Sequence, residues 1–184
     1  MSRLTLHTLE SAPVASRPFV ERALAANGYL PNLIGVLANA PVALETYLTV
    51  AGINARASLS LAERETVQIT AARIHRCDFC VAGHTAVALK KAGIATDDVR
   101  ALQQGKPLQD ARLDALRRFA EAAIATRGNV APDDYTAFTA AGFNEAQALE
   151  VLLGISLATL CNFANSLAGT PVNPELQPFL AGAI

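Results

Sequence analysis

The sequence predicts an all-α protein. Helix-capping signals recur along the 184 residues, apolar residues recur at intervals of three and four, and no alternating apolar and polar stretch predicts a strand. Just over half of the residues are hydrophobic and about a sixth are charged, which is enough apolar material for a well-packed core. We therefore expect a single domain, residues 1–184, with about eight helices.

Each helix is predicted from signals at its ends. A proline near the first turn and a glycine just past the last turn mark helix 16–27. Ser60 and Glu63 have the spacing of a capping box, and Asn144 is a preferred capping residue for the long apolar helix that follows it. The proline-rich tail after Gly169 is expected to be extended. The other expected helices are 31–40, 41–57, 60–75, 77–91, 96–105, 110–128 and 132–141.

Composition excludes several classes of partner. The formal net charge is −1, so nothing predicts binding to nucleic acid or to a membrane surface. The first 18 residues lack the apolar core of a secretion signal, and a cytoplasmic location is expected. The uncharged segment from Val151 carries Ser156, Asn162 and Asn165, which favours a buried helix over a membrane span. The high apolar fraction predicts a homo-oligomer.

The reactive residue types gather in the segment RIHRCDFCVAGH, residues 73–84. On a helix that begins at Cys77, the side chains of Cys77, Cys80 and His84 share one stripe. Helical residues three apart have Cα atoms about 5 Å apart, which a disulfide accepts. The first helical turn favours a thiolate, which argues for Cys77 as the nucleophile. His84 leans back toward Cys80 and can take its proton, which argues for Cys80.

Glu65 is the fourth candidate. A hairpin near residues 75–76 would fold the helix that carries Glu65 back along the helix that carries His84. The carboxylate would then lie level with residues 85–88, close enough to orient the imidazole and hold its proton.

These four residues carry a resemblance to a known family. Glu65, eleven residues, Cys77, two residues, Cys80, three residues and His84 resemble the motif of the AhpD-like alkylhydroperoxidases of the carboxymuconolactone decarboxylase superfamily. The core of the resemblance covers about residues 40–95, the expected redox core. The later segment NFANSLAGTPVNPEL resembles the tail of the peroxidase-related branch.

The resemblance implies an all-helical AhpD-like fold of about eight helices, with the CxxC motif at the start of a central helix, assembled as a trimer or hexamer. It implies a thiol peroxidase that needs no cofactor and no metal. Cys80 would attack a hydroperoxide, Cys77 would form the disulfide with it, and Glu65 and His84 would relay protons. An external dithiol, carried in the family by a lipoyl-bearing partner, would reduce the disulfide.

One position departs from the family. AhpD itself has a second histidine immediately before the second cysteine, where this sequence has Phe79. A relay with His84 alone would be slower or adapted to another oxidant. Phe79 would wall the site and exclude water, or simply pack in the core.

Other interpretations stay open from the sequence. His75, Cys77, Cys80 and His84 offer zinc-ligand types, although four ligands within ten residues surround a tetrahedral ion poorly. A redox sensor, a disulfide-exchange protein and a lactone-decarboxylase-like lyase are the alternative functions. A lyase is disfavoured because the decarboxylase members lack the cysteine pair. Cys161 is expected to be an inert core thiol. Asn162 and Asn165 could line the pocket or cap neighbouring backbone, and the structural role is the expected one.

Overall fold

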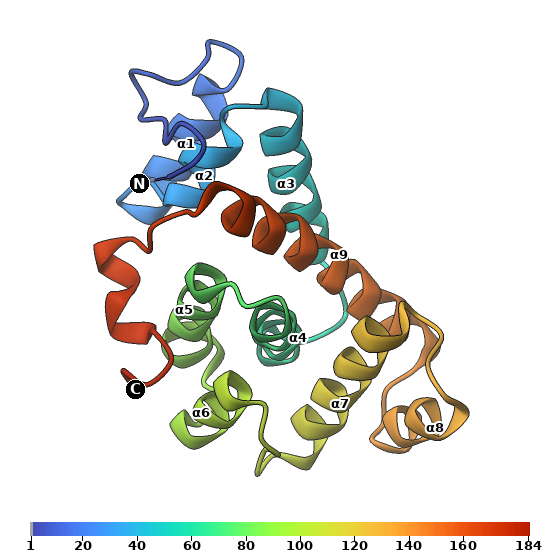
Figure 1. The fold of residues 1–184 in the computed structure, drawn as a ribbon. Coiled ribbons are helices and arrows are strands. Elements are labelled where there is room, and N and C mark those ends of the chain that lie inside the picture. The colour runs from blue at the N-terminus through green and yellow to red at the C-terminus, as the bar shows by residue number, and fades with distance from the viewer. Residues whose placement is uncertain (1) are drawn as a thin grey trace.

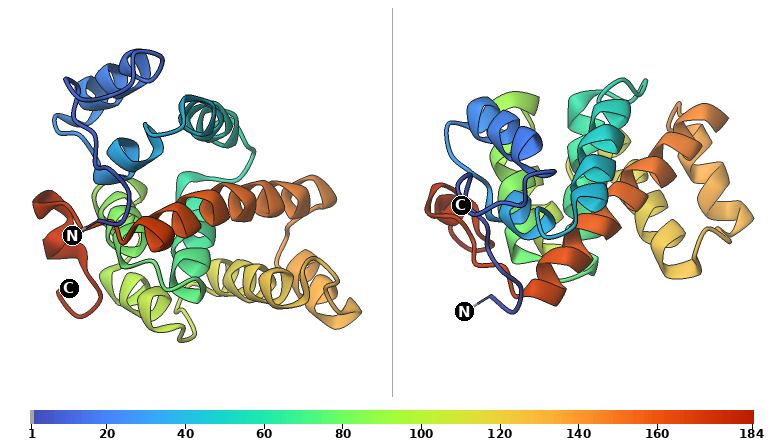
Figure 2. Two further views of the ribbon diagram at one scale, coloured as in Figure 1. Left: turned by 45° about the horizontal axis from the view of Figure 1, so that its top comes forward. Right: turned by 90° about the horizontal axis from the view of Figure 1, so that it is seen from above.

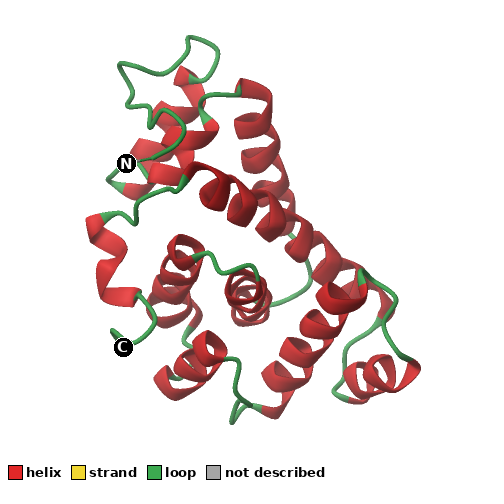
Figure 3. Cartoon of the chain, viewed as in Figure 1, coloured by secondary structure: helices red, strands yellow, loops and turns green. Residues whose placement is uncertain are grey.

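The computed structural model describes residues 2–184 and confirms the all-α prediction. These residues form nine α-helices, one π-helix and one 3₁₀-helix, without a strand (Figure 3). Their bounds are α1 Arg17–Asn27, α2 Asn32–Leu37, α3 Pro41–Asn54, α4 Leu61–Ile74, α5 Asp78–Val87, η1 Ala88–Ala92, α6 Thr96–Gln104, α7 Ala111–Thr126, α8 Pro132–Ala140, α9 Glu145–Ala168 and η2 Pro174–Phe179.

Helix α4 lies in the middle of the fold, with α5, α6, α7 and α9 around it (Figure 1). Every residue of α4 from Glu65 to Ala72 is buried, because neighbouring helices cover all of its sides. The expected capping box is present: the Ser60 hydroxyl accepts from the Glu63 amide at 3.2 Å, and the Glu63 carboxylate accepts from the Ser60 amide at 2.7 Å. This start fixes the helix that carries Glu65.

Helix α9 crosses the molecule and joins its two halves (Figure 2). At one end Val151 packs with Phe119, Phe138 and Phe143 from α7, α8 and the loop before α9. At the other end Cys161 joins the core cluster that also holds the CxxC motif. By length and composition α9 alone, among the described helices, could span a membrane, and 44% of its most apolar 18-residue window is buried within the protein.

The chain after Gly169 differs from its predicted extended form. Pro174–Phe179 forms the 3₁₀-helix η2, which packs against α5. The Asn173 side chain accepts from the Asn32 amide at 2.8 Å and donates to the Leu30 carbonyl at 3.2 Å. Leu176 enters the core around the CxxC motif. Tertiary contacts therefore fold a segment whose prolines alone predict an extended chain.

Replacing Ser60 with alanine should lower the free energy of unfolding by about 1 kcal/mol, because the Glu63 amide loses its acceptor at the start of α4. Urea titration followed by circular dichroism measures the change. Ser166→Ala is the control, since Ser166 is exposed on α9. Equal stability of the Ser60 and Ser166 variants would show that the capping box does not hold α4.

Candidate active site

The site is built on a tight hairpin between α4 and α5. Arg76 joins the helices in the left-handed conformation, with φ 56°, which costs a non-glycine residue roughly 1–2 kcal/mol. The Cys77 amide donates to the Ala72 carbonyl at 2.9 Å and so closes the end of α4. The expected hairpin near residues 75–76 is therefore present, and it sets α5 beside α4.

The two motif cysteines lie at the first turn of α5. Cys77 is the N-cap rather than the first helical residue: its backbone is extended, and its Sγ accepts from the Cys80 amide at 3.3 Å. Both side chains are buried, and both are free thiols. The amides of the first helical turn have no partner within the helix, so a sulfur at the cap lies where a helix best stabilises an anion.

Asn165 of α9 connects to both sulfurs. Its Nδ2 donates to the Cys80 Sγ at 3.2 Å and to the Cys77 Sγ at 3.7 Å. Its Oδ1 is buried without a hydrogen-bond partner among the described residues, which is costly in a protein interior. The orphaned oxygen shows that packing alone does not account for an amide here. Asn165, which the sequence suggested was structural, therefore belongs to the dithiol site.

The two thiols differ in acidity. The pKa of Cys77 is lowered, chiefly by a hydrogen bond from the Cys80 thiol and further by the Cys80 amide and the Asn165 amide, against the opposing effect of burial. The pKa of Cys80 is raised, because its thiol donates that bond and is buried. After the pair has lost its first proton, the remaining proton lies between the two sulfurs and the charge rests mainly on Cys77.

Glu65 and His84 meet across the hairpin, as expected. The Glu65 Oε2 lies 2.7 Å from the His84 Nδ1, and Glu65 is 7% exposed. Burial acts to lower the pKa of His84, but the charge and hydrogen bond of Glu65 outweigh it, so the pKa is raised. Because Nδ1 faces the carboxylate, Nε2 is the nitrogen left for chemistry. The structure places no hydrogen bond between this ring and either sulfur.

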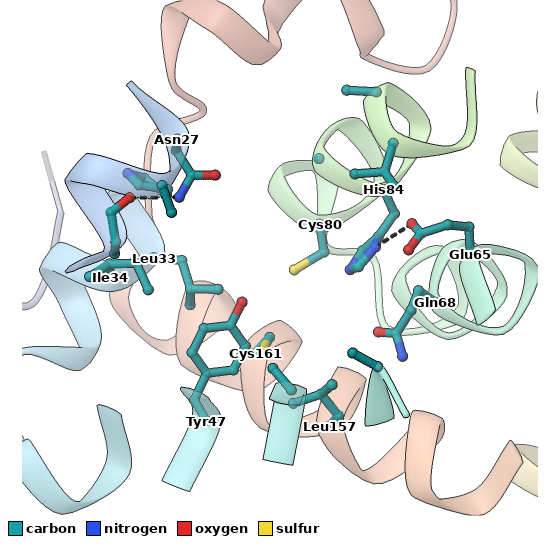
Figure 4. Close-up of a pocket in the computed structure, with 18 of the residues that line it drawn as sticks. Asn27, Leu33, Ile34, Tyr47, Glu65, Gln68, Cys80, His84, Leu157 and Cys161 are labelled. Carbon is teal, nitrogen blue, oxygen red and sulfur yellow. Dashed lines mark hydrogen bonds and ion pairs between the residues drawn. The ribbon is translucent and has the colours of Figure 1, made fainter. Parts of the chain in front are cut away.

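A pocket of about 970 Å³ brings these groups to one space. Cys80, His84 and Glu65 line it, whereas Cys77 does not (Figure 4). Tyr47 and Cys161 form the wall across from Cys80. Access therefore favours Cys80 as the residue that meets a substrate, while acidity favours Cys77.

Several residues that line the pocket belong to no sequence motif that would predict their place there. Cys161 is buried as expected, and burial, followed by the charge of Cys77, raises its pKa to about 12, so it is a protonated thiol of the pocket wall. Tyr47 and Gln68 come from α3 and α4. Phe79 is buried and also lines the pocket, so it does contribute to the wall. Only the folded chain brings these distant positions together.

The four side chains considered for zinc do not converge. His75 lies 3.0 Å from Asn162 through its Nδ1 and packs edge-on against Phe163, while His84 faces Glu65. Within residues 2–184 no three His, Cys, Asp or Glu side chains are grouped as a metal site. The arrangement instead provides two thiols, an acid–base pair and an amide donor.

Both the fold and one segment of the chain are similar to known proteins. Residues 41–122 match the model of the carboxymuconolactone decarboxylase family. The chain also has the fold of solved AhpD-like structures over its whole length. The chain therefore has an AhpD-like fold, and its segment 41–122 is similar to the carboxymuconolactone decarboxylase family.

Particular structures of this fold come from several proteins. An alkylhydroperoxidase AhpD core, an uncharacterized peroxidase-related protein from Ralstonia eutropha JMP134, aligns with a TM-score of 0.84 at 20% identity, covering 100% of this chain and 97% of the other. An uncharacterized peroxidase-related protein from Silicibacter sp. TM1040 gives 0.80 at 20%, covering 98% and 94%. A cysteine variant of the debrominase Bmp8 in complex with 2,3,4-tribromopyrrole gives 0.75 at 14%, covering 97% and 96%. A search of curated proteins found no match.

Replacing Glu65 with glutamine should lower the pKa of His84, because the neutral amide no longer stabilises the imidazolium. The ring will then lose its proton at a lower pH than in the wild type. A titration of the histidine ring signals by NMR measures this directly. Glu63→Gln is the control, since Glu63 is also buried on α4 but pairs with Arg112. An unchanged His84 titration in Glu65→Gln would contradict the pairing.

Replacing Asn165 with aspartate keeps the side-chain shape but puts an oxygen where Nδ2 donates to the sulfurs. We expect the pKa of Cys77 to rise, because the amide donor is lost and a carboxylate beside the sulfurs disfavours the thiolate. The pH dependence of iodoacetamide alkylation reports this pKa. Asn162→Asp, one turn earlier on α9 and bonded to His75, is the matched control. If both variants behave like the wild type, Asn165 does not tune the dithiol.

Proposed function

We propose that this protein is a thiol-dependent peroxidase that reduces hydroperoxides through a Cys77/Cys80 dithiol–disulfide cycle, with Glu65 and His84 as the proton relay. The observation that carries the proposal is that Cys80 and His84 line one pocket, while Cys77 lies outside its lining with its Sγ 3.3 Å from the Cys80 amide nitrogen. The AhpD-like fold and the peroxidase-related proteins that share it support the same class of chemistry.

In the first step the Cys80 thiolate attacks one oxygen of the hydroperoxide. The O–O bond breaks, Cys80 becomes a sulfenic acid, and the leaving alkoxide takes a proton from Nε2 of the His84 imidazolium to depart as an alcohol. Cys80 reaches the thiolate form when the proton that the two sulfurs share moves to Cys77. The raised pKa of His84 keeps its proton available for the leaving group.

In the second step the Cys77 sulfur attacks the sulfur of the sulfenic acid. The S–S bond forms and hydroxide leaves as water after taking a proton. The proton that moved to Cys77 in the first step passes to the departing hydroxide, and the amide donors that lower the pKa of Cys77 favour this release. The net reaction consumes one hydroperoxide and two thiols and gives an alcohol, water and a disulfide.

An external dithiol completes the cycle by thiol–disulfide exchange. By analogy with the family, the proposed reductant is a lipoyl-bearing protein, and the proposed assembly is a homo-oligomer, either trimer or hexamer, in the cytoplasm. Apolar side chains exposed along α9, including Leu149, Phe163 and Leu167, support an oligomer, since a monomer rarely leaves so many in water.

Replacing either motif cysteine with serine should separate their roles. Cys80→Ser should abolish dithiol-dependent hydroperoxide consumption, whereas Cys77→Ser should react once and leave a sulfenic acid on Cys80. Steady-state peroxide assays and mass spectrometry after dimedone trapping measure these outcomes. Cys161→Ser is the control and should keep turning over, because its thiol stays protonated.

Two results would point elsewhere. A dimedone adduct on Cys77 in Cys80→Ser would reverse the order of attack. Peroxide oxidation of the wild type without turnover by any dithiol would favour a redox sensor or a disulfide-exchange protein, and a non-redox activity that survives in Cys77→Ala would favour a lyase.

A further inference from the structure

One side of α5 and of the η1 turn that follows it carries a stripe of pocket-lining residues that runs from Cys80 to two lysines. Cys80, Gly83, Val87, Lys90 and Lys91 all line the same pocket. Lys90 and Lys91 are adjacent in sequence, and adjacent residues of an α-helix point about 100° apart. They lie in the π-helix η1 that continues α5, and π-helical turns are rare and frequent at functional sites. In this wider π-helical turn, both lysines lie on the side of the helix that lines the pocket.

Gly83 keeps this stripe open. A Cβ at Gly83 would meet nothing nearer than the Leu176 Cδ1 at 3.9 Å, which is ordinary contact. Glycine within a helix costs about 0.5–1 kcal/mol relative to alanine, and here no close neighbour requires it. The space that a side chain would fill lies between Cys80 and the lysines, where a ligand would run.

The charges around the pocket are unequal. Arg22, Lys90 and Lys91 line it, and none of the three forms an ion pair with a carboxylate within residues 2–184. Lys90 and Arg22 instead lie over the rings of Phe179 and Phe19. Arg64 also lines the pocket, but its guanidinium donates a hydrogen bond to the Leu59 carbonyl.

Few negative charges offset these cations. Among the described residues, Glu65 is the one carboxylate that lines the pocket, and it is paired with His84. Glu175, exposed on η2, acts electrostatically on Tyr29 at the pocket wall. An uncompensated cationic rim around an apolar pocket attracts a ligand that brings its own anion.

We propose that the substrate is an amphipathic hydroperoxide: an apolar chain with an anionic end group, which Lys90 and Lys91 bind while the peroxide group reaches Cys80. The ten residues from Cys80 to Lys90 correspond to about 15 Å along a helix, so the chain must be long enough to span most of that distance. The proposal rests on the peroxidase function for the peroxide group, but the binding of the anionic chain does not.

Binding of unreactive chains tests this directly. Dodecanoate, dodecyl phosphate, dodecanol and butanoate are titrated into the wild-type protein by calorimetry, with protection of Cys80 from alkylation as a second readout. We expect both long-chain anions to bind and to protect Cys80, with dodecanol weaker by about three- to tenfold and butanoate weaker still. Preference for one long-chain anion over the other identifies a carboxylate or a phosphate as the end group.

Three variants locate the site. Lys90→Gln/Lys91→Gln should remove the preference for dodecanoate over dodecanol, whereas Lys106→Gln, an exposed lysine outside the pocket, should retain it. Gly83→Leu should weaken both long chains because it fills the stripe. A wild type that binds dodecanol as tightly as dodecanoate, or a double variant that keeps the preference, would overturn the proposal. Anion binding without peroxide turnover would instead refute the peroxidase function alone.

Discussion

The pairing of α4 with α5 is the constraint on which the site depends. A single residue in the left-handed conformation, Arg76, turns the chain between them. Because both helices are then fixed side by side, Glu65 meets His84 at 2.7 Å although nineteen positions separate them in sequence. The same turn leaves Cys77 as the cap of α5. Any change that opened the hairpin would disperse the acid–base pair and alter the helix end that stabilises the thiolate.

Local patterns in the sequence were sufficient to predict much of this hairpin. The capping box at Ser60, the stripe of Cys77, Cys80 and His84, and the register of Glu65 all follow from helical spacing within about twenty residues. Helix types and most boundaries follow for the same reason.

What the sequence could not supply depends on distant segments. Asn165 contacts the sulfurs from 85 positions beyond Cys80, and no local pattern distinguishes it from Asn162, which contacts His75 instead. The 3₁₀-helix after Gly169 forms against α5, so its own prolines do not reveal it. Cys161 faces the pocket only because α9 crosses it. The π-helix at Lys90 and Lys91 likewise interrupts a segment that reads as one continuous helix.

The contact from Asn165 to the sulfurs also has a consequence for how the protein is made. During synthesis the CxxC hairpin leaves the ribosome well before the C-terminal helix does, so the emerging thiols lack their amide donor. The dithiol thus gains this amide donor only after α9 has been translated, and a chain that stopped before Asn165 would contain the motif without that hydrogen bond.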